Sequence, residues 1–128
     1  MNLIPEQRLD RNVIESDIDF LLSLGSIQAK TGVKVEDPKS YLAQGYDAVC
    51  VTTGLWKPIE LGIENEDARG VMTGIDFLRL SNEKKPLDIG KRVMVVGGGN
   101  VSVDVALTAR RLGATDVHMA CLERWEEM

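Results

Sequence analysis

The sequence is poor in the residues that build disulfides and metal sites. It contains two cysteines and a single histidine among 128 residues. Cys50 and Cys121 both lie in apolar, strand-like runs, so we expect a reduced, buried pair of small hydrophobic side chains. His118 has no cysteine or acidic cluster spaced around it as metal ligands, and we expect it to be structural. The cysteine usage favours a cytoplasmic protein.

Positive charge and long apolar runs are equally scarce. The net charge of −5 offers no basic surplus for binding nucleic acid. No apolar run approaches the ~20 residues that span a bilayer, and the first residues lack the pattern of a secretory signal. No arrangement of serine, histidine and acid indicates hydrolysis, and no residue is assigned as catalytic. With 44% hydrophobic and 27% charged residues, the composition is that of a soluble globular protein with one domain or two half-domains.

The strongest signal surrounds three successive glycines. The apolar run Val93–Val96 predicts a buried parallel strand, Gly97–Gly99 follow at once, and a helical pattern runs from Asn100 to a stop at Gly113. A dinucleotide-binding loop requires this order of strand, glycine turn and helix. Gly97 is expected to allow the tight turn and Gly99 to let the backbone approach a pyrophosphate, which faces the N–H groups at the helix start. A plain turn is the alternative reading.

The predicted dinucleotide contacts lie in the loop and the first helical turn. A serine replaces the third glycine of the usual pattern and is small enough for close packing of helix on strand. A P-loop would need Lys-Ser/Thr after the last glycine, where this chain has Asn-Val. The expected contacts are Gly97, Gly98, Gly99, Asn100, Val101 and Ser102.

A second strand is predicted at Asp116–Leu122, after the helix. Strand, helix and strand in this order form a parallel βαβ unit. Glu123, at the end of this strand, is placed to accept hydrogen bonds from the ribose diol of an adenosine. The alternative is a solvated charge in an acidic run.

The earlier part of the chain predicts further α and β elements. We expect helices at Asp10–Leu24, from its apolar stripe and Gly25, at residues 38–44, from Pro38 and Gly45, and at Ile75–Leu80. Residues 27–35 suggest one or two short strands, and Ala48–Thr52 predicts a buried strand that ends at Thr53-Gly54. The fold class is therefore α/β, with Rossmann-like three-layer βαβ units and a parallel sheet.

Three ordered segments resemble the glutamate synthase small-subunit family. They are Ile4-Pro5-Glu6-Gln7-Arg8-Leu9, then Tyr46 to Gly54, then Gly97-Gly98-Gly99-Asn100-Val101-Ser102-Val103-Asp104. Members of this family are FAD- and NAD(P)-dependent oxidoreductases with two Rossmann-like domains, the nicotinamide domain inserted into the flavin domain. The resemblance implies that residues 1–65 are the middle of an FAD-type domain and residues 66–128 the first half of an NAD(P)-binding domain.

The resemblance also implies roles for single residues. Thr53 and Gly54 are expected to run close to FAD, the alternative being an ordinary turn at a strand end. Asp104 is expected near the nicotinamide and flavin, the alternative being a solvent-facing helix carboxylate. Many NADPH-using relatives carry adjacent arginines at the positions of Leu122 and Glu123, so Glu123 favours NADH, although the neighbouring Arg124 could still contact a 2′-phosphate.

The resemblance implies electron transfer from NAD(P)H through flavin to a partner subunit. The flavin fingerprint and the cysteines that hold iron–sulfur clusters in many members are missing, so we expect a piece of a longer protein that does not turn over alone. The competing interpretation is a non-catalytic nucleotide-binding or subunit-interaction module. Strands without neighbours would leave Val93–Val96 and Val49–Val51 bare, which favours association into a homodimer.

Overall fold

The computed structural model describes residues 3–122 and 124. Its elements in chain order are α1 (Arg11–Ser23), α2 (Lys39–Leu42), α3 (Gly74–Asn82), β1 (Arg92–Val96), α4 (Asn100–Arg111) and β2 (Asp116–Ala120). Two units form, Met1–Arg11 with Trp56–Met128 and Asn12–Leu55. The assignment of residues 1–65 and 66–128 to a flavin and a nicotinamide domain stays a prediction.

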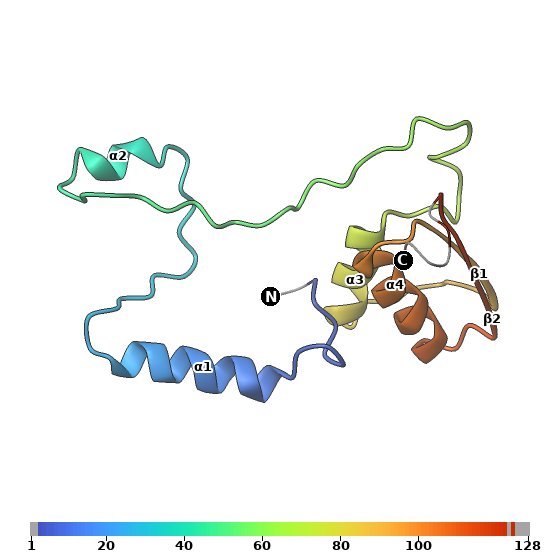
Figure 1. Ribbon diagram of the computed structural model, residues 1–128, viewed down its shortest axis with the longest axis horizontal. Helices are drawn as coiled ribbons and strands as arrows, with labels where there is room; N and C mark the ends of the chain where they lie inside the picture. Colours follow the sequence, from blue (N-terminus) through green and yellow to red (C-terminus); the bar gives the residue numbers. More distant parts are fainter. Residues whose placement is uncertain (1–2, 123, 125–128) are drawn as a thin grey trace. The chain divides into compact units, whose positions relative to one another are not determined.

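The first unit is built on the predicted βαβ element. β1 and β2 pair in parallel, with Arg92 opposite Asp116 and Val96 opposite Ala120, and α4 packs on both strands and on α3 (Figure 1). A parallel pair needs a crossover, and the apolar positions of α4 supply the face that covers the sheet. The α/β class and the parallel strands are confirmed, whereas the three-layer arrangement stays a prediction.

The core of this unit lies between α3, α4 and the covered face of the sheet. It consists of Phe77, Leu78, Ala109 and Ala114, with Val93, Val105 and Val117 packed against it. Ala109 has no exposed surface. Its small side chain lets α3 approach α4 closely, because interaxial distances follow the size of the residues at the contact.

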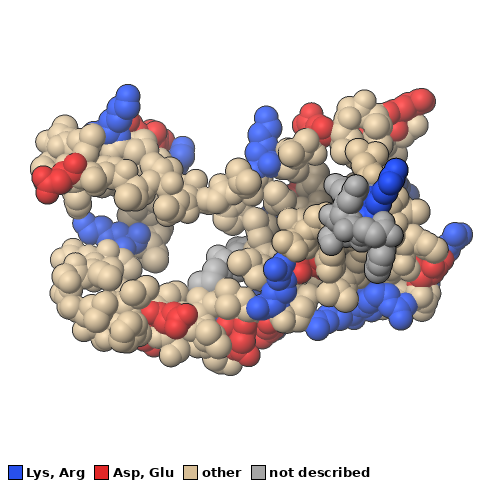
Figure 2. All heavy atoms as spheres, in the orientation of Figure 1, with Lys and Arg blue, Asp and Glu red and all other residues tan. Residues whose placement is uncertain are grey.

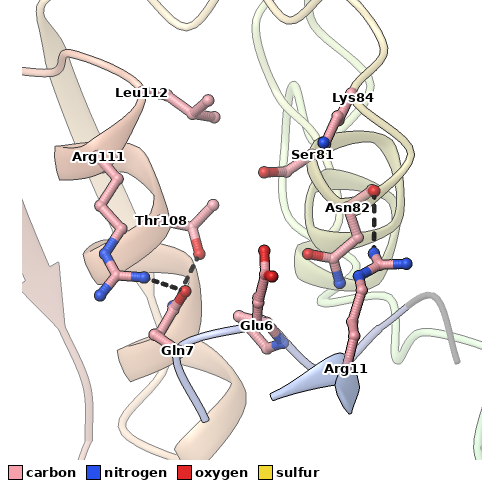
Figure 3. Close-up of a pocket in the computed structure, with 10 residues that line it drawn as sticks. Glu6, Gln7, Arg11, Ser81, Asn82, Lys84, Thr108, Arg111 and Leu112 are labelled. Atoms are coloured by element: carbon pink, nitrogen blue, oxygen red, sulfur yellow. Dashed lines mark hydrogen bonds between the residues drawn. The ribbon is translucent and has the colours of Figure 1, made fainter. Parts of the chain in front are cut away.

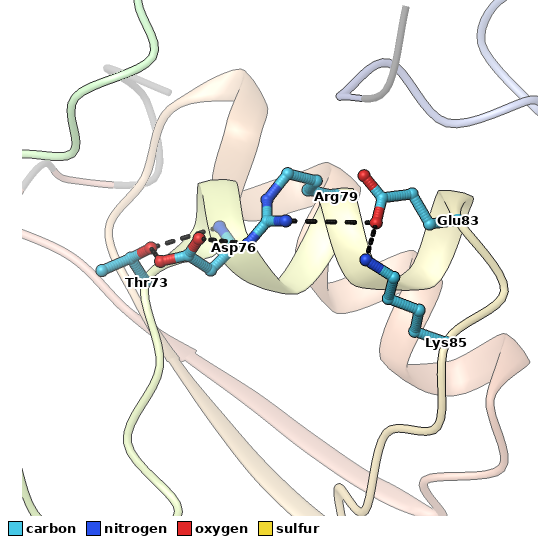
Figure 4. A network of polar contacts seen from close by, with 5 residues as sticks. All are labelled: Thr73, Asp76, Arg79, Glu83 and Lys85. Carbon is cyan, nitrogen blue, oxygen red and sulfur yellow. Dashed lines mark hydrogen bonds and ion pairs between the residues drawn. The ribbon is translucent and has the colours of Figure 1, made fainter.

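Helix α3 is held by polar contacts along its length (Figure 4). The Thr73 hydroxyl accepts a hydrogen bond from the Asp76 N–H at 3.2 Å, which caps the helix. Thr73 also donates to the Asp76 carboxylate at 2.9 Å, and Arg79 contacts the same carboxylate at 3.1 Å. The Thr73 hydrogen bond first, and Arg79 second, hold the pKa of Asp76 below its ordinary value. Toward its C-terminal end, Glu83 contacts Lys85 at 2.6 Å.

A carboxylate also shapes the loop before α3. Glu66 accepts hydrogen bonds from the N–H groups of Leu61 and Gly62 at 2.7 and 2.8 Å. These two backbone bonds stabilise the charged form and lower the pKa of Glu66. The two hydrogen bonds therefore fix the backbone of this loop.

The other face of the sheet is bare. Val95 is 6% exposed, but Met94 is 63% and Val96 61% exposed, because successive residues of a strand point to opposite faces. The prediction that Val93–Val96 is buried on both faces is therefore wrong for this structure. The prediction that these residues are left exposed agrees with Met94 and Val96.

The second unit contains α1 beyond its first residue, and α2. Both helices confirm the predictions, and Gly25 and Gly45, just past their ends, have φ of 81° and 93°. The predicted strands at 27–35 and Ala48–Thr52 are wrong, since these residues form no strand. A strand exists through hydrogen bonds to a neighbour, and the described residues of this unit supply none.

Residues of the predicted strand Ala48–Thr52 are exposed, because that strand does not form. Val51 is 63% exposed, and Cys50 is exposed as well. The expectation of a buried Cys50 is therefore wrong, while Cys121 is half-buried and both thiols are free of a disulfide.

Basic and acidic side chains are interspersed on the face seen in Figure 2, and uncharged residues occupy most of it. Leu55 and Ile59 are among the most exposed apolar side chains, at 90% and 91%. Within residues 3–122, no helix combines the length and apolar character that crossing a membrane requires.

Candidate dinucleotide site

The glycine loop begins where β1 ends, and Gly97 makes its turn. The Gly97 N–H donates to the Ala120 carbonyl at 2.7 Å, which ties the loop to the end of β2. Gly97 has φ of 127°, a region that side-chain-bearing residues rarely adopt. A Cβ built there would lie 2.6 Å from Ser102 Oγ. The backbone turn therefore requires glycine at position 97, with a small residue at position 102.

Gly99 has a different environment. Its φ of −79° and ψ of 173° suit any residue, and it occupies the N-cap of α4 without a side-chain cap. A Cβ built on Gly99 would meet nothing within 4 Å. No contact of the described chain explains glycine here, and the space in front of its Cα lies open.

The start of α4 offers donors to an anion. The Gly99 carbonyl accepts from the Ser102 and Val103 N–H groups at 2.9 and 3.3 Å. The N–H groups of Asn100 and Val101, at the first positions of the helix, have no intrahelical acceptor. They lie at the positive end of the helix dipole, beside the open space at Gly99. This geometry fits the pyrophosphate of a dinucleotide.

Asp104 lies on the covered side of α4 and is 7% exposed. Arg8 Nη1 contacts Asp104 Oδ2 at 3.0 Å. The alternative of a solvent-facing carboxylate is therefore wrong. The expected proximity of Asp104 to nicotinamide and flavin stays a prediction.

The apolar spacing of α4, at Val101, Val105, Ala109 and Leu112, predicts its buried side only in part. Val105 and Ala109 pack in the core, whereas Val101 and Leu112 are 50% and 46% exposed, and Thr108 is 6% exposed. The polar side chains at 104 and 108 are covered because the N-terminal turn supplies partners for them. Sequence reasoning missed the residues of that turn, since the pairing of Arg8 with Asp104 spans 96 positions.

The remaining predicted contacts are Thr53, Gly54, Glu123 and Arg124. Thr53 and Gly54 belong to the second unit, are exposed, and form no helix or strand. Gly54 has φ of 77°. Glu123 lies outside the described residues, and Arg124 is exposed. Their contacts with cofactor stay predictions.

Histidine and the acidic residues form no metal site in the described part of the chain. No group of three or more His, Cys, Asp or Glu side chains is placed to hold an ion there. His118 Nε2 lies 2.7 Å from Asp116 Oδ1 on the open face of the sheet, with 62% of its side chain exposed.

A separate hollow lies at the other end of α4 (Figure 3). It measures about 170 Å³ and is lined by the N-terminal turn, the end of α3 and the C-terminal half of α4. Figure 3 shows the end of the Gln7 side chain in contact with Thr108 and Arg111. Arg11 donates to the Asn82 carbonyl at 3.4 Å. Pockets for drug-sized ligands measure roughly 300–1,000 Å³, so this hollow is too small for a dinucleotide.

Residues 5–126 match the sequence profile of the pyridine nucleotide-disulphide oxidoreductases. The chain belongs to this family. The match covers β1, the glycine loop, α4 and β2, so the loop with the uncapped helix start lies inside the family domain. A Rossmann-like fold follows from this membership.

Relatives within this oxidoreductase family include the subunit type that the sequence resembles. The chain is 32% identical to the glutamate synthase [NADPH] small chain of Bacillus subtilis over 90% of its own length. It is 40% identical to the NADP(+)-dependent formate dehydrogenase subunit beta of Moorella thermoacetica over 91% of its length. The resemblance to glutamate synthase small subunits is confirmed.

The name of a third relative also contains NADPH and the word subunit. The chain is 37% identical to the NADPH-Fe(3+) oxidoreductase subunit beta of Geobacter sulfurreducens over 88% of its length. It spans 17% of the Geobacter and Moorella proteins and 26% of the Bacillus protein. The activities in these names belong to much longer chains.

Proposed function

We propose that this chain is a segment of an FAD- and NAD(P)H-dependent oxidoreductase and binds the nicotinamide dinucleotide at Gly97–Ser102. The observation that carries the proposal is the open, uncapped start of α4 at Gly99. Family membership and the relatives' names, which carry NADP(+) or NADPH, support it. The relatives are named as subunits or small chains, which supports a partner subunit as electron acceptor.

The chain's own residues bind and orient the cofactor in this proposal. When bound, NAD(P)H supplies a hydride that FAD accepts. The N–H groups of Asn100 and Val101 hold the pyrophosphate, and Gly99 keeps the approach free. Thr53 and Gly54 are proposed to lie along the flavin. We further propose a cytoplasmic location.

The experiment that tests the proposal is calorimetric titration of the chain with NADH and NADPH, together with an absorbance spectrum of the purified protein. We expect saturable binding of at least one dinucleotide. A chain that binds neither contradicts the proposal. Dinucleotide binding by a complete protein that purifies without flavin and transfers no hydride would instead support the non-catalytic module.

Cofactor choice gives a separate prediction. In a complete protein containing this segment, we expect NADH to be preferred over NADPH, because the Glu123 carboxylate repels a 2′-phosphate. Glu123→Arg should shift the ratio of kcat/KM values toward NADPH by about tenfold, the effect of roughly 1.4 kcal/mol. Glu64→Arg makes the same charge change at an exposed site and should leave the ratio unchanged.

Steady-state kinetics with each donor would measure this ratio. The three relatives described above are named for NADP(+) or NADPH, so a preference for NADH would set this segment apart from them. A clear preference for NADPH in the unaltered protein would show that Glu123 does not decide the choice.

The bare sheet face leads us to propose that the 128-residue chain self-associates. Met94 and Val96 project from this face, and within the described residues each strand has one edge without a partner strand. We expect light scattering to show a mass that rises with concentration toward a homodimer. Val96→Lys should reduce association, whereas Ile59→Lys, at a side chain 91% exposed outside the sheet, should not. The mass of one chain at all concentrations would contradict the expectation.

A further inference from the structure

Asp104 is a buried carboxylate close to the start of the helix that would receive an anion. It follows Asn100, the first residue of α4, by four positions, which is about 6 Å along the helix axis. Its side chain is 10% exposed. A buried negative charge is screened weakly by solvent, so by itself it would oppose an anion at this end of α4.

Arg8 balances this charge. Its guanidinium lies 3.0 Å from Asp104 Oδ2 and retains 48% exposure of its side chain. No other ion pair to Asp104 is present among the described residues. The positive charge that compensates Asp104 therefore comes from the N-terminal turn, 96 positions away in the sequence.

The turn that carries Arg8 is anchored at several points. Pro5 is fully buried, and its carbonyl accepts hydrogen bonds from the N–H groups of Arg8 and Leu9 at 2.9 and 3.3 Å. One helical turn beyond Asp104, Gln7 Nε2 donates to Thr108 Oγ1 at 3.5 Å. Arg111 donates to Gln7 Oε1. These contacts hold Arg8 against α4 rather than leaving it as a mobile surface cation.

We propose that Arg8 is a positioning residue of the dinucleotide site, which keeps the start of α4 electropositive by neutralising Asp104. The inference rests on the proposed function, because it assigns this pair a part in dinucleotide binding. The role proposed for the Arg8–Asp104 pair differs from that of a purely structural ion pair in one respect. What matters for binding is the charge of Asp104, rather than the bond between the two side chains.

A double-mutant cycle tests this difference. We expect Arg8→Met to weaken dinucleotide affinity about tenfold, since it leaves the Asp104 charge uncompensated. Asp104→Asn removes the opposing charge and leaves that of Arg8, so it should tighten the affinity. The double variant Arg8→Met/Asp104→Asn should recover the wild-type affinity although the ion pair is absent. Calorimetry with NADH and NADPH measures all four proteins, and a thermal melt of each defines the temperature at which it is folded.

A structural pair gives the opposite pattern. It predicts that Asp104→Asn weakens binding and that the double variant stays weak, and either result overturns the inference. Arg8→Lys keeps the charge and should retain the affinity. If Arg8→Met does not fold, Asp104→Asn decides the question, because it leaves no buried charge unpaired: tighter binding supports the inference and weaker binding overturns it.

The matched control removes another cation of the same segment. Arg11 contacts the Asn82 carbonyl rather than Asp104, so Arg11→Met should leave the affinity unchanged. An equal loss in Arg11→Met and Arg8→Met would reduce the effect to overall charge and overturn the inference. A wild-type chain that binds neither dinucleotide overturns the proposed function and this role with it. Wild-type binding with an unrescued double variant overturns this inference alone.

Discussion

Replacing Gly99 with valine is expected to abolish dinucleotide binding while leaving the fold intact. The backbone at Gly99 is extended, with φ of −79° and ψ of 173°, and a Cβ there meets nothing within 4 Å. Valine therefore fits the free chain, but its branched side chain fills the space through which a pyrophosphate would reach the start of α4. We expect an affinity loss of about 100-fold or more, which corresponds to roughly 2.7 kcal/mol. Calorimetric titration would measure it.

The matched control is the same substitution at Gly97. With φ of 127° and Ser102 Oγ 2.6 Å from the Cβ position, valine at 97 should destabilise the first unit by about 1–3 kcal/mol and also disturb the loop. Thermal melts should therefore separate the two variants, with only Gly97→Val melting earlier. Wild-type affinity in Gly99→Val would count against the site, and a large loss of stability in Gly99→Val would show that Gly99 has a structural role.

Truncating Leu78 to alanine is expected to cause one of the largest losses of stability in the chain. Leu78 is 3% exposed and packs in a core of few residues between α3 and α4. Removing its branched end costs burial and leaves a cavity, together about 2–5 kcal/mol. Native domains have total stabilities of about 5–15 kcal/mol, so the first unit should unfold under mild conditions. Chemical denaturation followed by circular dichroism would measure the loss.

Ile59→Ala is the control for this substitution. The Ile59 side chain is 91% exposed, so its truncation removes little buried surface and should change stability by less than about 0.5 kcal/mol. Equal effects of the two truncations would show that Leu78 is not in a packed core in solution. Because α3 supports α4, loss of Leu78 should also weaken dinucleotide binding.

The helices were predictable from the sequence because their signals are local. The apolar spacing of α1, α3 and α4, and the glycines at 25, 45 and 113, lie within one or two turns of the elements that they define. The parallel pairing of β1 with β2 was predictable for a related reason. A strand, a glycine turn and a crossover helix leave few other arrangements of so short a segment.

Strand formation outside the β1–α4–β2 element could not be predicted in the same way. Ala48–Thr52 has the composition of a buried strand, yet the described chain provides no neighbour for it, and Val51 is 63% exposed. Strand propensity reflects packing against neighbouring strands more than an intrinsic preference of the backbone. For the same reason, Met94 and Val96 are exposed on β1, although its apolar sequence predicts a buried strand.

The sequence by itself determined the α/β class, the parallel βαβ unit and the position of the glycine loop, because each follows from residues close together in the chain. The separate roles of Gly97 and Gly99 follow from their places in the motif, but only the tertiary structure gave the left-handed φ of 127° at Gly97 and the open space at Gly99. The partner of Asp104 was likewise decided by the fold. An ion pair between Arg8 and Asp104 depends on how an N-terminal turn packs against α4, and no local pattern encodes a contact across 96 positions.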